Sequence, residues 1–326
     1  MNRLLLVCFL YWLAPIALAQ NGRIISRQPY QLQQFDTLMQ RIATRQGDHW
    51  QYKPAYTYLN EVVLEELFYE SDGLKVKAYA AYPREGHGPW PAIIYNRGGN
   101  RSFGALNEYK IAFIMARVAS WGYVVVGSQY RGNDGGEGQE EFGGADVHDV
   151  LNLIPLLENW PGVDAGKIGM FGWSRGGMMT YLALLQTDRI KAAAVGGALA
   201  DLDLMDKSRG GEMGQYVFSE LIPGYTQNRD SVLRLRSAVY HADKLSKTTP
   251  ILLLHGTADW RVVPEESLHM ALALQKARVP YRLVMFEGGD HALSEHRDEV
   301  YAMIKAWLQK YVIDGAPLPD LQPHGK

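Results

Sequence analysis

The stretch Gly172-Trp173-Ser174-Arg175-Gly176-Gly177 separates an apolar segment, Ile168–Phe171, from a helix predicted over Gly176–Gln186. In the pattern G-x-S-x-G between a strand and a helix, a tight turn strains the serine and exposes its hydroxyl above the sheet. Glycine is needed on both sides because side chains there would collide with the strand and the helix. The first N–H groups of the helix, beginning with Arg175, point toward an oxyanion at the serine. The alternative interpretation is an ordinary glycine-rich turn with a bystander serine.

Strands alternate with helices along the chain around this turn. The central strands are nearly continuous apolar runs, which is typical of a mostly parallel sheet covered by helices on both faces. The polar and aromatic stretch at residues 201–245 interrupts the alternation. It predicts a small helical cap over the carboxyl ends of the strands, where the active sites of open α/β sheets lie. The predicted strands are an antiparallel edge pair, Glu66–Glu70 and Lys75–Tyr82, then Ala92–Tyr95, Tyr123–Ser128, Lys167–Gly172, Ala192–Gly196, Thr249–His255 and Tyr281–Phe286.

Two further residues are placed to activate the serine. A serine hydroxyl needs a base, and histidine suits this role because its pKa lies near the operating pH. His291 follows the last predicted strand and Asp259 follows the strand before it, so both stand at carboxyl ends of strands. His255 is interpreted as structural, and Asp290 adjoins His291 too closely to reach round to its ring. The chain order Ser174, Asp259, His291 matches that of α/β-hydrolases.

Composition argues against several classes of protein. The 326 residues carry a net charge of -2 without a run of Lys and Arg, which argues against a nucleic-acid partner. The one cysteine, Cys8, makes no intrachain disulfide and no cysteine-based zinc site. The acidic loop with Asp134, Glu137, Glu140 and Glu141 lacks the spacing of a calcium loop. No metal and no cofactor are expected, and the sequence leaves the oligomeric state open.

The first 19 residues are interpreted as a signal peptide. Arg3 precedes an apolar run, Leu4–Leu13, and Ala17-Leu18-Ala19 has the pattern of a cleavage site. An uncleaved membrane anchor is the alternative, although the apolar run is short for a span. The mature chain is therefore expected to be secreted or periplasmic, without stable membrane insertion. Residues 20–60 are expected to form a helical lead-in, with a helix over Tyr30–Thr44, before the main domain at 61–326.

From Glu61 to Tyr311 the chain resembles the catalytic domain of the prolyl oligopeptidase family of serine peptidases. The segments that carry the resemblance are Tyr130-Arg131-Gly132 with Phe142-Gly143-Gly144, the serine turn at 172–177, His255-Gly256-Thr257-Ala258-Asp259-Trp260-Arg261-Val262, and Asp290-His291. The resemblance implies an α/β-hydrolase fold with Ser174 as the nucleophile, Asp259 as the orienting acid and His291 as the base.

Two departures from the family pattern bear on specificity. Family peptidases usually carry a large β-propeller before this domain, whereas only residues 20–60 precede it here, so no propeller is expected. Family peptidases also usually place a tyrosine hydroxyl in the oxyanion site, and the matching position here is Arg97, in the loop Asn96-Arg97-Gly98-Gly99. The Arg97 guanidinium is expected to donate to the oxyanion or to hold an acidic group of the substrate. The glycines of the loop let the backbone approach the substrate oxygen.

Three functions follow, in order of preference. The first is a secreted serine hydrolase that cleaves short peptides through an acyl-enzyme. The second is a carboxylesterase acting on small acyl or acetyl esters, and the third is a non-catalytic binding protein on a hydrolase fold. The intact triad argues against the third. The candidate walls of the substrate pocket are aromatic, with plain core residues as the alternative interpretation: Trp173, Tyr216, Phe218, Tyr225 and Trp260.

Overall fold

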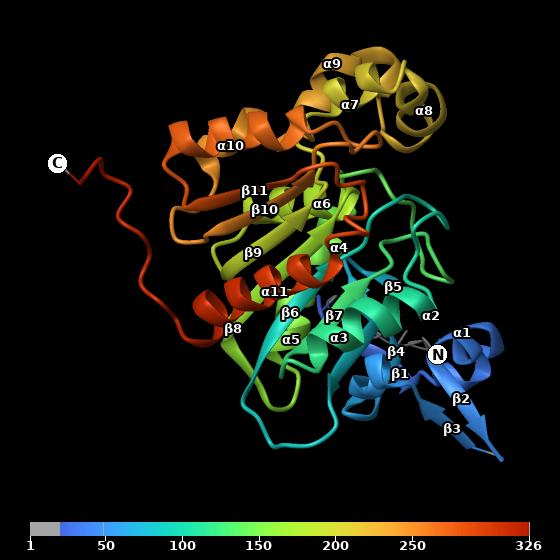
Figure 1. Ribbon diagram of the computed structural model, residues 1–326. Helices are drawn as coiled ribbons and strands as arrows, with labels where there is room; N and C mark the ends of the chain where they lie inside the picture. The colour runs from blue at the N-terminus through green and yellow to red at the C-terminus, as the bar shows by residue number, and fades with distance from the viewer. Residues whose placement is uncertain (1–19, 48, 326) are drawn as a thin grey trace, which may run out of the picture.

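The computed structural model describes residues 20–47 and 49–325 (Figure 1). The segment interpreted as a signal peptide, residues 1–19, lies outside these residues. In the part of the chain that the structure describes, no helix is long and apolar enough to cross a membrane.

A nine-stranded sheet forms the centre of this described part, in the order β1-β4-β5-β7-β6-β8-β9-β10-β11 (Figure 1). The strands from β7 to β11 in this order run parallel. At the other edge, β1, β4 and β5 are antiparallel to their neighbours. The predicted, mostly parallel sheet is therefore confirmed. The bounds are β1 Ile24–Pro29, β4 Val62–Ser71, β5 Leu74–Pro83, β6 Trp90–Asn96, β7 Val124–Ser128, β8 Val163–Trp173, β9 Ile190–Gly196, β10 Ile251–Gly256 and β11 Tyr281–Phe286.

The edge hairpin between β4 and β5 shows how the local sequence sets the topology. Asp72 and Gly73 form a two-residue turn between the paired residues Ser71 and Leu74. Both turn residues have a positive φ, 53° for Asp72 and 79° for Gly73. A type I′ hairpin turn requires positive φ at both positions, and Asp-Gly is among the sequences that adopt it most readily. The predicted edge pair is confirmed, with longer strands than expected.

Alternate side chains of the parallel strands pack in two separate hydrophobic cores, one on each face of the sheet. In β7, Val124 and Val126 pack in the core on one face of the sheet, and Val125 packs in the core on the other. The helices that cover the first core are α4 (Val147–Leu151), α5 (Leu153–Glu158), α6 (Arg175–Leu184) and α10 (Glu265–Ala277). Those that cover the second are α1 (Asp36–Ile42), α2 (Glu108–Lys110), η3 (Ile111–Met115), α3 (Ala116–Ala119), α11 (Arg297–Leu308) and η6 (Gln309–Ile313).

The lead-in before residue 61 is only partly helical, which corrects the expectation. The helix predicted over Tyr30–Thr44 forms over Asp36–Ile42 alone. The strand β1 pairs with β4 and so covers backbone groups that would otherwise leave an open sheet edge. The remaining elements are η1 (Leu32–Gln34), η2 (Pro54–Asn60) and a hairpin of β2 (Ala43–Gln46) and β3 (His49–Tyr52).

The segment at 201–245 folds into short helices, and Figure 1 shows α7, α8 and α9 grouped at one end of the sheet. The side chain of Asp201 caps α7 by accepting hydrogen bonds from two N–H groups in its first turn. The Glu266 carboxylate of α10 accepts from the N–H groups of Ala200 and Asp201, at 2.8 and 2.6 Å. These bonds tie the start of the predicted cap to the main domain. The cap elements are α7 (Leu202–Ser208), η4 (Gly214–Phe218), α8 (Ser219–Leu221), α9 (Tyr225–Leu235) and η5 (Ala238–Lys244).

Candidate active site

Ser174 stands on the turn between β8 and α6 in a strained backbone conformation. Its φ is 59° and its ψ is -126°, which a non-glycine residue rarely adopts. The flanking glycines are required sterically: a Cβ at Gly172 would overlap the carbonyl of Gly176, and a Cβ at Gly176 would overlap the carbonyl of Asn96. The structure therefore has the tight strand–turn–helix geometry that the sequence predicts around the serine.

Asp259 and His291 lie on the loops that follow the neighbouring parallel strands β10 and β11. Nδ1 of His291 is 2.7 Å from Oδ2 of Asp259. The other oxygen of Asp259 accepts hydrogen bonds from the backbone N–H groups of Arg261 and Val262, at 2.9 and 3.0 Å. Burial opposes ionisation of Asp259, but the hydrogen bonds from His255 and His291 outweigh it, so the pKa of Asp259 lies well below its usual range. Asp259 is thus a fixed, ionised partner for the His291 ring.

His255 supports the same carboxylate from within the core. Its Nε2 lies 2.9 Å from the carbonyl oxygen of Val262 and 3.3 Å from Oδ2 of Asp259. A carbonyl oxygen only accepts, so Nε2 carries a proton. Nδ1 forms a second hydrogen bond, 2.6 Å long, with the Ser267 hydroxyl. His255 is therefore a buried ring with both nitrogens hydrogen-bonded, in agreement with its interpretation as structural.

Asp290, the competing carboxylate, accepts hydrogen bonds from residues of its own turn. It accepts hydrogen bonds from the N–H groups of Ala292 and Ser294, at 3.1 and 3.0 Å, and from the Ser294 hydroxyl at 3.2 Å. These bonds lower the pKa of Asp290, with the N–H of Ser294 as the largest cause. Asp290 therefore fixes the turn that carries His291, while the His291 ring is bonded to Asp259.

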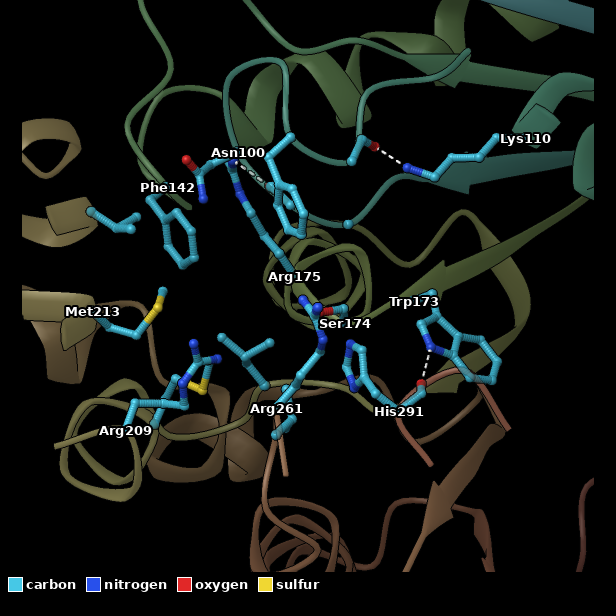
Figure 2. A pocket seen from close by; sticks show the side chains of 18 of the residues that line it. Asn100, Lys110, Phe142, Trp173, Ser174, Arg175, Arg209, Met213, Arg261 and His291 are labelled. Carbon is cyan, nitrogen blue, oxygen red and sulfur yellow. Dashed lines mark hydrogen bonds between the residues drawn. The ribbon is translucent and has the colours of Figure 1, made fainter. Parts of the chain in front are cut away.

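A cavity of about 430 Å³ opens beside the serine, and Figure 2 shows Ser174 and His291 next to each other within it. Its volume lies in the usual range for a small-ligand pocket, roughly 300–1,000 Å³. The wall is mainly apolar, with contributions from the loop after β6, from α6 and from the cap. Its lining residues are Tyr95, Gly98, Gly99, Asn100, Phe103, Gly104, Lys110, Ile114, Phe142, Trp173, Ser174, Arg175, Leu199, Met205, Arg209, Met213, Val217, Arg261, Val262 and His291.

Two backbone segments approach the serine where an oxyanion would form. Arg175 is the first residue of α6, and the first N–H groups of a helix have no partner within the helix. The backbone of Gly98 lies against the serine turn, because a Cβ at Gly98 would stand 2.9 Å from the Trp173 carbonyl oxygen and 3.2 Å from Cβ of Ser174. The predicted need for glycine in this loop thus has a steric basis.

The side chain of Arg97 does not reach this cavity, contrary to expectation. Its guanidinium is fully buried and donates to the carbonyl oxygens of Gln129 at 2.8 Å and Arg101 at 3.1 Å, while stacking on Tyr130. The Tyr130 hydroxyl in turn donates to the carbonyl of Arg97 at 2.9 Å. Arg97 therefore fixes the loop that presents Gly98, and its guanidinium contacts neither an oxyanion nor a substrate group.

The side chain of Arg175 has a structural role beside its backbone. It is buried and forms ion pairs with Glu140 at 2.6 Å and with Asp146 at 2.5 Å. It also donates to the carbonyl of Gly99 at 2.9 Å. Burial would lower the pKa of Arg175, but the two carboxylates outweigh it and raise the pKa. Arg175 thus joins the serine turn to the glycine-rich loop and to the loop that carries both acids.

Of the five aromatic residues predicted as pocket walls, only Trp173 lines the cavity. Its Nε1 donates to the carbonyl of His291 at 2.8 Å (Figure 2). Tyr216 and Trp260 are 58% and 63% exposed, while Phe218 is fully buried with its ring centroid 5.2 Å from that of Phe142. Tyr225 packs on Phe218 instead of facing the cavity. Tyr216, Phe218, Tyr225 and Trp260 are therefore not among the residues that line this cavity.

The sequence interpretation missed the cap residues that do face the cavity. They are Met205, Arg209, Met213 and Val217, which recur at every fourth position. Met205 and Arg209 belong to α7 and its C-cap, whereas Met213 and Val217 belong to the N-cap and the body of the separate π-helical turn η4. The regular spacing therefore does not reflect one helix face, and the sequence offered no clear signal for this set. The basic residue Arg261 was also missed as a wall residue, although it follows Asp259 by two positions.

Comparison with known proteins places the chain in a family. The model of the prolyl oligopeptidase family matches residues 109–314. The peptidase YtmA of Bacillus subtilis is 32% identical over 220 residues, which cover 67% of this chain and 82% of YtmA. The peptidase YuxL of the same organism is 29% identical, over 76% of this chain and 39% of YuxL. The chain belongs to the prolyl oligopeptidase family of serine peptidases.

Solved structures show the same fold. An acylaminoacyl peptidase of Pyrococcus horikoshii superposes with a TM-score of 0.66 at 24% identity, over 79% of this chain and 43% of that protein. A puromycin-hydrolyzing peptidase of Mycobacterium tuberculosis superposes with a TM-score of 0.60 at 26% identity, over 74% of this chain and 38% of that protein. The predicted α/β-hydrolase fold is therefore confirmed. The chain spans less than half of each of these two proteins. Because the relatives are peptidases, the carboxylesterase alternative is not favoured.

Proposed function

We propose that this protein hydrolyses short peptides through an acyl-enzyme, with Ser174 as the nucleophile, His291 as the general base and Asp259 as the residue that orients the base. The observation that carries the proposal is the 2.7 Å hydrogen bond between His291 and Asp259. It holds His291 in the wall of the cavity that also contains the strained Ser174.

The geometry supports a defined sequence of proton transfers. Asp259 occupies Nδ1 of His291, so Nε2 is the nitrogen left to receive the Ser174 proton as the hydroxyl oxygen attacks the peptide carbonyl. The N–H groups of Arg175 and Gly98 stabilise the resulting oxyanion. The protonated ring then gives its proton to the leaving amine, which breaks the C–N bond and leaves an ester on Ser174. Water attacks this ester with His291 again as the base, and releases the acid and the free serine.

The cap and the cavity favour small substrates. A cavity of about 430 Å³ accommodates a few amino-acid residues beside Ser174. Met205, Met213 and Val217 of the cap line one side of it. We therefore expect short peptides and accessible chain ends to be cleaved, in preference to internal bonds of folded proteins.

Export is a separate part of the proposal. The pattern of residues 1–19 supports removal of a signal peptide after Ala19 and a secreted or periplasmic location. The test is N-terminal sequencing of the protein recovered from the medium or periplasm of the producing cells. A mature N-terminus at Gln20 agrees with export, and an intact N-terminus at Met1 in the cytoplasm contradicts it.

The test of the activity is hydrolysis of a set of dipeptides to pentapeptides by the purified protein, beside matched p-nitrophenyl esters. We expect peptide-bond cleavage that the Ser174→Ala variant lacks. Hydrolysis of the esters without cleavage of any peptide would contradict the proposed peptidase and favour an esterase.

A further inference from the structure

The wall of the cavity carries positive charge without a carboxylate. Four basic residues line it, Lys110, Arg175, Arg209 and Arg261, and none of the described lining residues is Asp or Glu. A cavity lined by one sign of charge attracts ligands of the opposite sign. A ligand would pair only with those of the four charges that the protein itself leaves without a close partner.

Two of the four are already occupied by the protein. Arg175 is neutralised by its ion pairs with Glu140 and Asp146. The ammonium of Lys110 donates to the carbonyl oxygens of Gly104 and Ala105, and burial lowers the pKa of Lys110 to about 8. These two residues stabilise loops around the cavity.

Arg209 and Arg261 are held differently, by stacking on the same indole ring. The guanidinium carbons of Arg209 and Arg261 lie 4.9 and 5.1 Å from the ring centroid of Trp260. An arginine stacked by its face keeps its N–H edge for hydrogen bonds, and this edge matches the two oxygens of a carboxylate. In Figure 2 Arg209 extends from the side of the cap, and Arg261 lies between it and His291.

Neither guanidinium has a close acidic partner in the described residues. Arg261 has no carboxylate within ion-pair distance among them, and Arg209 has only Glu212, at 3.7 Å. Glu212 is on the surface, with 63% of its side chain exposed, whereas 21% of the Arg209 side chain is exposed. Two like charges on one ring repel each other, so an anion placed between them would gain free energy from both.

We propose that Arg209 and Arg261 form a subsite for a carboxylate of the substrate. Resting on the proposed function, this makes the preferred substrates short peptides with a carboxylate close to the bond that is cleaved. The carboxylate is either an acidic side chain or a free C-terminus. Trp260 is the ring on which both guanidinium groups stack, and its indole is 63% exposed.

The test measures binding in the Ser174→Ala protein, which does not turn over. Three ligands are titrated by NMR: acetyl-glutamate amide with a side-chain carboxylate, acetyl-glutamine with a C-terminal carboxylate, and acetyl-glutamine amide with neither. Hydrogen bonds to charged groups contribute about 1.5–3 kcal/mol, so at least one carboxylate ligand should bind about tenfold more tightly than the neutral amide.

Arginine variants in the same Ser174→Ala background identify the subsite. Arg209→Gln and Arg261→Gln should each lower the affinity for the carboxylate ligand far more than the affinity for the neutral amide, and so remove most of this preference. Arg282→Gln is the matched control, because Arg282 is an exposed arginine that stacks on Trp307 at 5.4 Å and does not line the cavity. It should leave the preference intact.

The outcomes separate the two sources of the carboxylate. Tighter binding of acetyl-glutamate amide assigns the subsite to an acidic side chain, and tighter binding of acetyl-glutamine assigns it to a C-terminus. Equal affinity for all three ligands, no binding of either carboxylate, or a preference that survives in both arginine variants would overturn the proposal. The comparison of ligands does not depend on the folding of the variants. The comparison of ligands measures binding and not cleavage. A carboxylate preference in a protein that cleaves no peptide would therefore contradict the proposed function and leave the proposed subsite intact.

Discussion

His291 and Asp259 are joined by a hydrogen bond of 2.7 Å although they stand 32 positions apart in the chain. They meet because β10 and β11 are parallel neighbours, so the loops at their carboxyl ends lie side by side. Asp259 is also fixed by two backbone N–H groups and by His255. The orientation of the His291 ring is therefore set by a rigid part of the fold.

The first prediction concerns the choice between the two candidate acids. Asp259→Asn should lower turnover by about 10⁴-fold, because the ring of His291 then loses the partner that fixes its tautomer. Asp290→Asn is the matched control and should have a much smaller effect, since Asp290 bonds to Ala292 and Ser294. Steady-state kinetics on one peptide decide between them. A mild Asp259→Asn together with a severe Asp290→Asn would show that the assignment is wrong.

The second prediction concerns the backbone of Gly98. In Gly98→Ala the new Cβ would meet the Trp173 carbonyl oxygen at 2.9 Å and displace the loop from Ser174. Loss of an oxyanion donor typically lowers turnover by about 10²–10³-fold. We expect that loss with little change in the Michaelis constant. The control is Gly166→Ala, where the new Cβ would meet only the side chain of Asp164, at 3.1 Å. Normal turnover in Gly98→Ala would exclude this loop from the oxyanion site.

The third prediction compares a buried ion pair with an exposed one. Arg175→Met leaves the buried carboxylates of Glu140 and Asp146 without their counter-charge and should lower the free energy of unfolding by about 3–5 kcal/mol. Arg101→Met breaks an ion pair with the exposed Glu220 and should lower the free energy of unfolding by less than about 1 kcal/mol. Urea unfolding measures both. If both variants lost the same free energy of unfolding, the ion pairs of Arg175 would contribute no more to stability than a surface ion pair.

The fourth prediction concerns pH. Burial raises the pKa of Glu266 to about 8, whereas the unfolded chain has a Glu pKa of about 4.3. The folded protein therefore holds this proton more firmly, and its contribution to stability is fully present below about pH 4.3 and is lost as pH rises through about 8.

Glu266→Gln removes this titration and keeps an oxygen acceptor for the N–H groups of Ala200 and Asp201. The free energy of unfolding, measured in urea between about pH 5 and about pH 8, should fall less steeply with pH in the variant than in the wild type. Parallel curves for the two proteins would refute a buried, titrating Glu266.

The serine turn and its partners were predictable from the sequence because local and topological rules coincide there. The turn at 172–177 needs glycine for steric reasons that act within a few residues. The positions of Asp259 and His291 follow from a general property of parallel sheets, whose carboxyl ends share one edge. None of these inferences required knowledge of distant side-chain contacts.

Arg97 and the cap aromatics were not predictable in the same way. The direction of the Arg97 side chain is set by the Gln129 carbonyl and by Tyr130, which are more than 30 positions away. In the cap, η4 is a π-helical turn, which shifts the set of side chains that share a face. Phe218 consequently enters the core while Val217 faces the cavity. Residue type alone does not reveal either outcome.

The measurement that tests the central claim most directly is labelling of the protein by a fluorophosphonate probe, with the modified residue located by mass spectrometry. The wild type should be labelled on Ser174, in step with the loss of peptidase activity. Ser174→Ala should fold normally and take up no label, while Ser219→Ala, which removes an exposed cap hydroxyl, should label like the wild type. Labelling of Ser174→Ala at the wild-type rate, or an active wild type that carries its label on another residue, would contradict the assignment of Ser174 as the nucleophile.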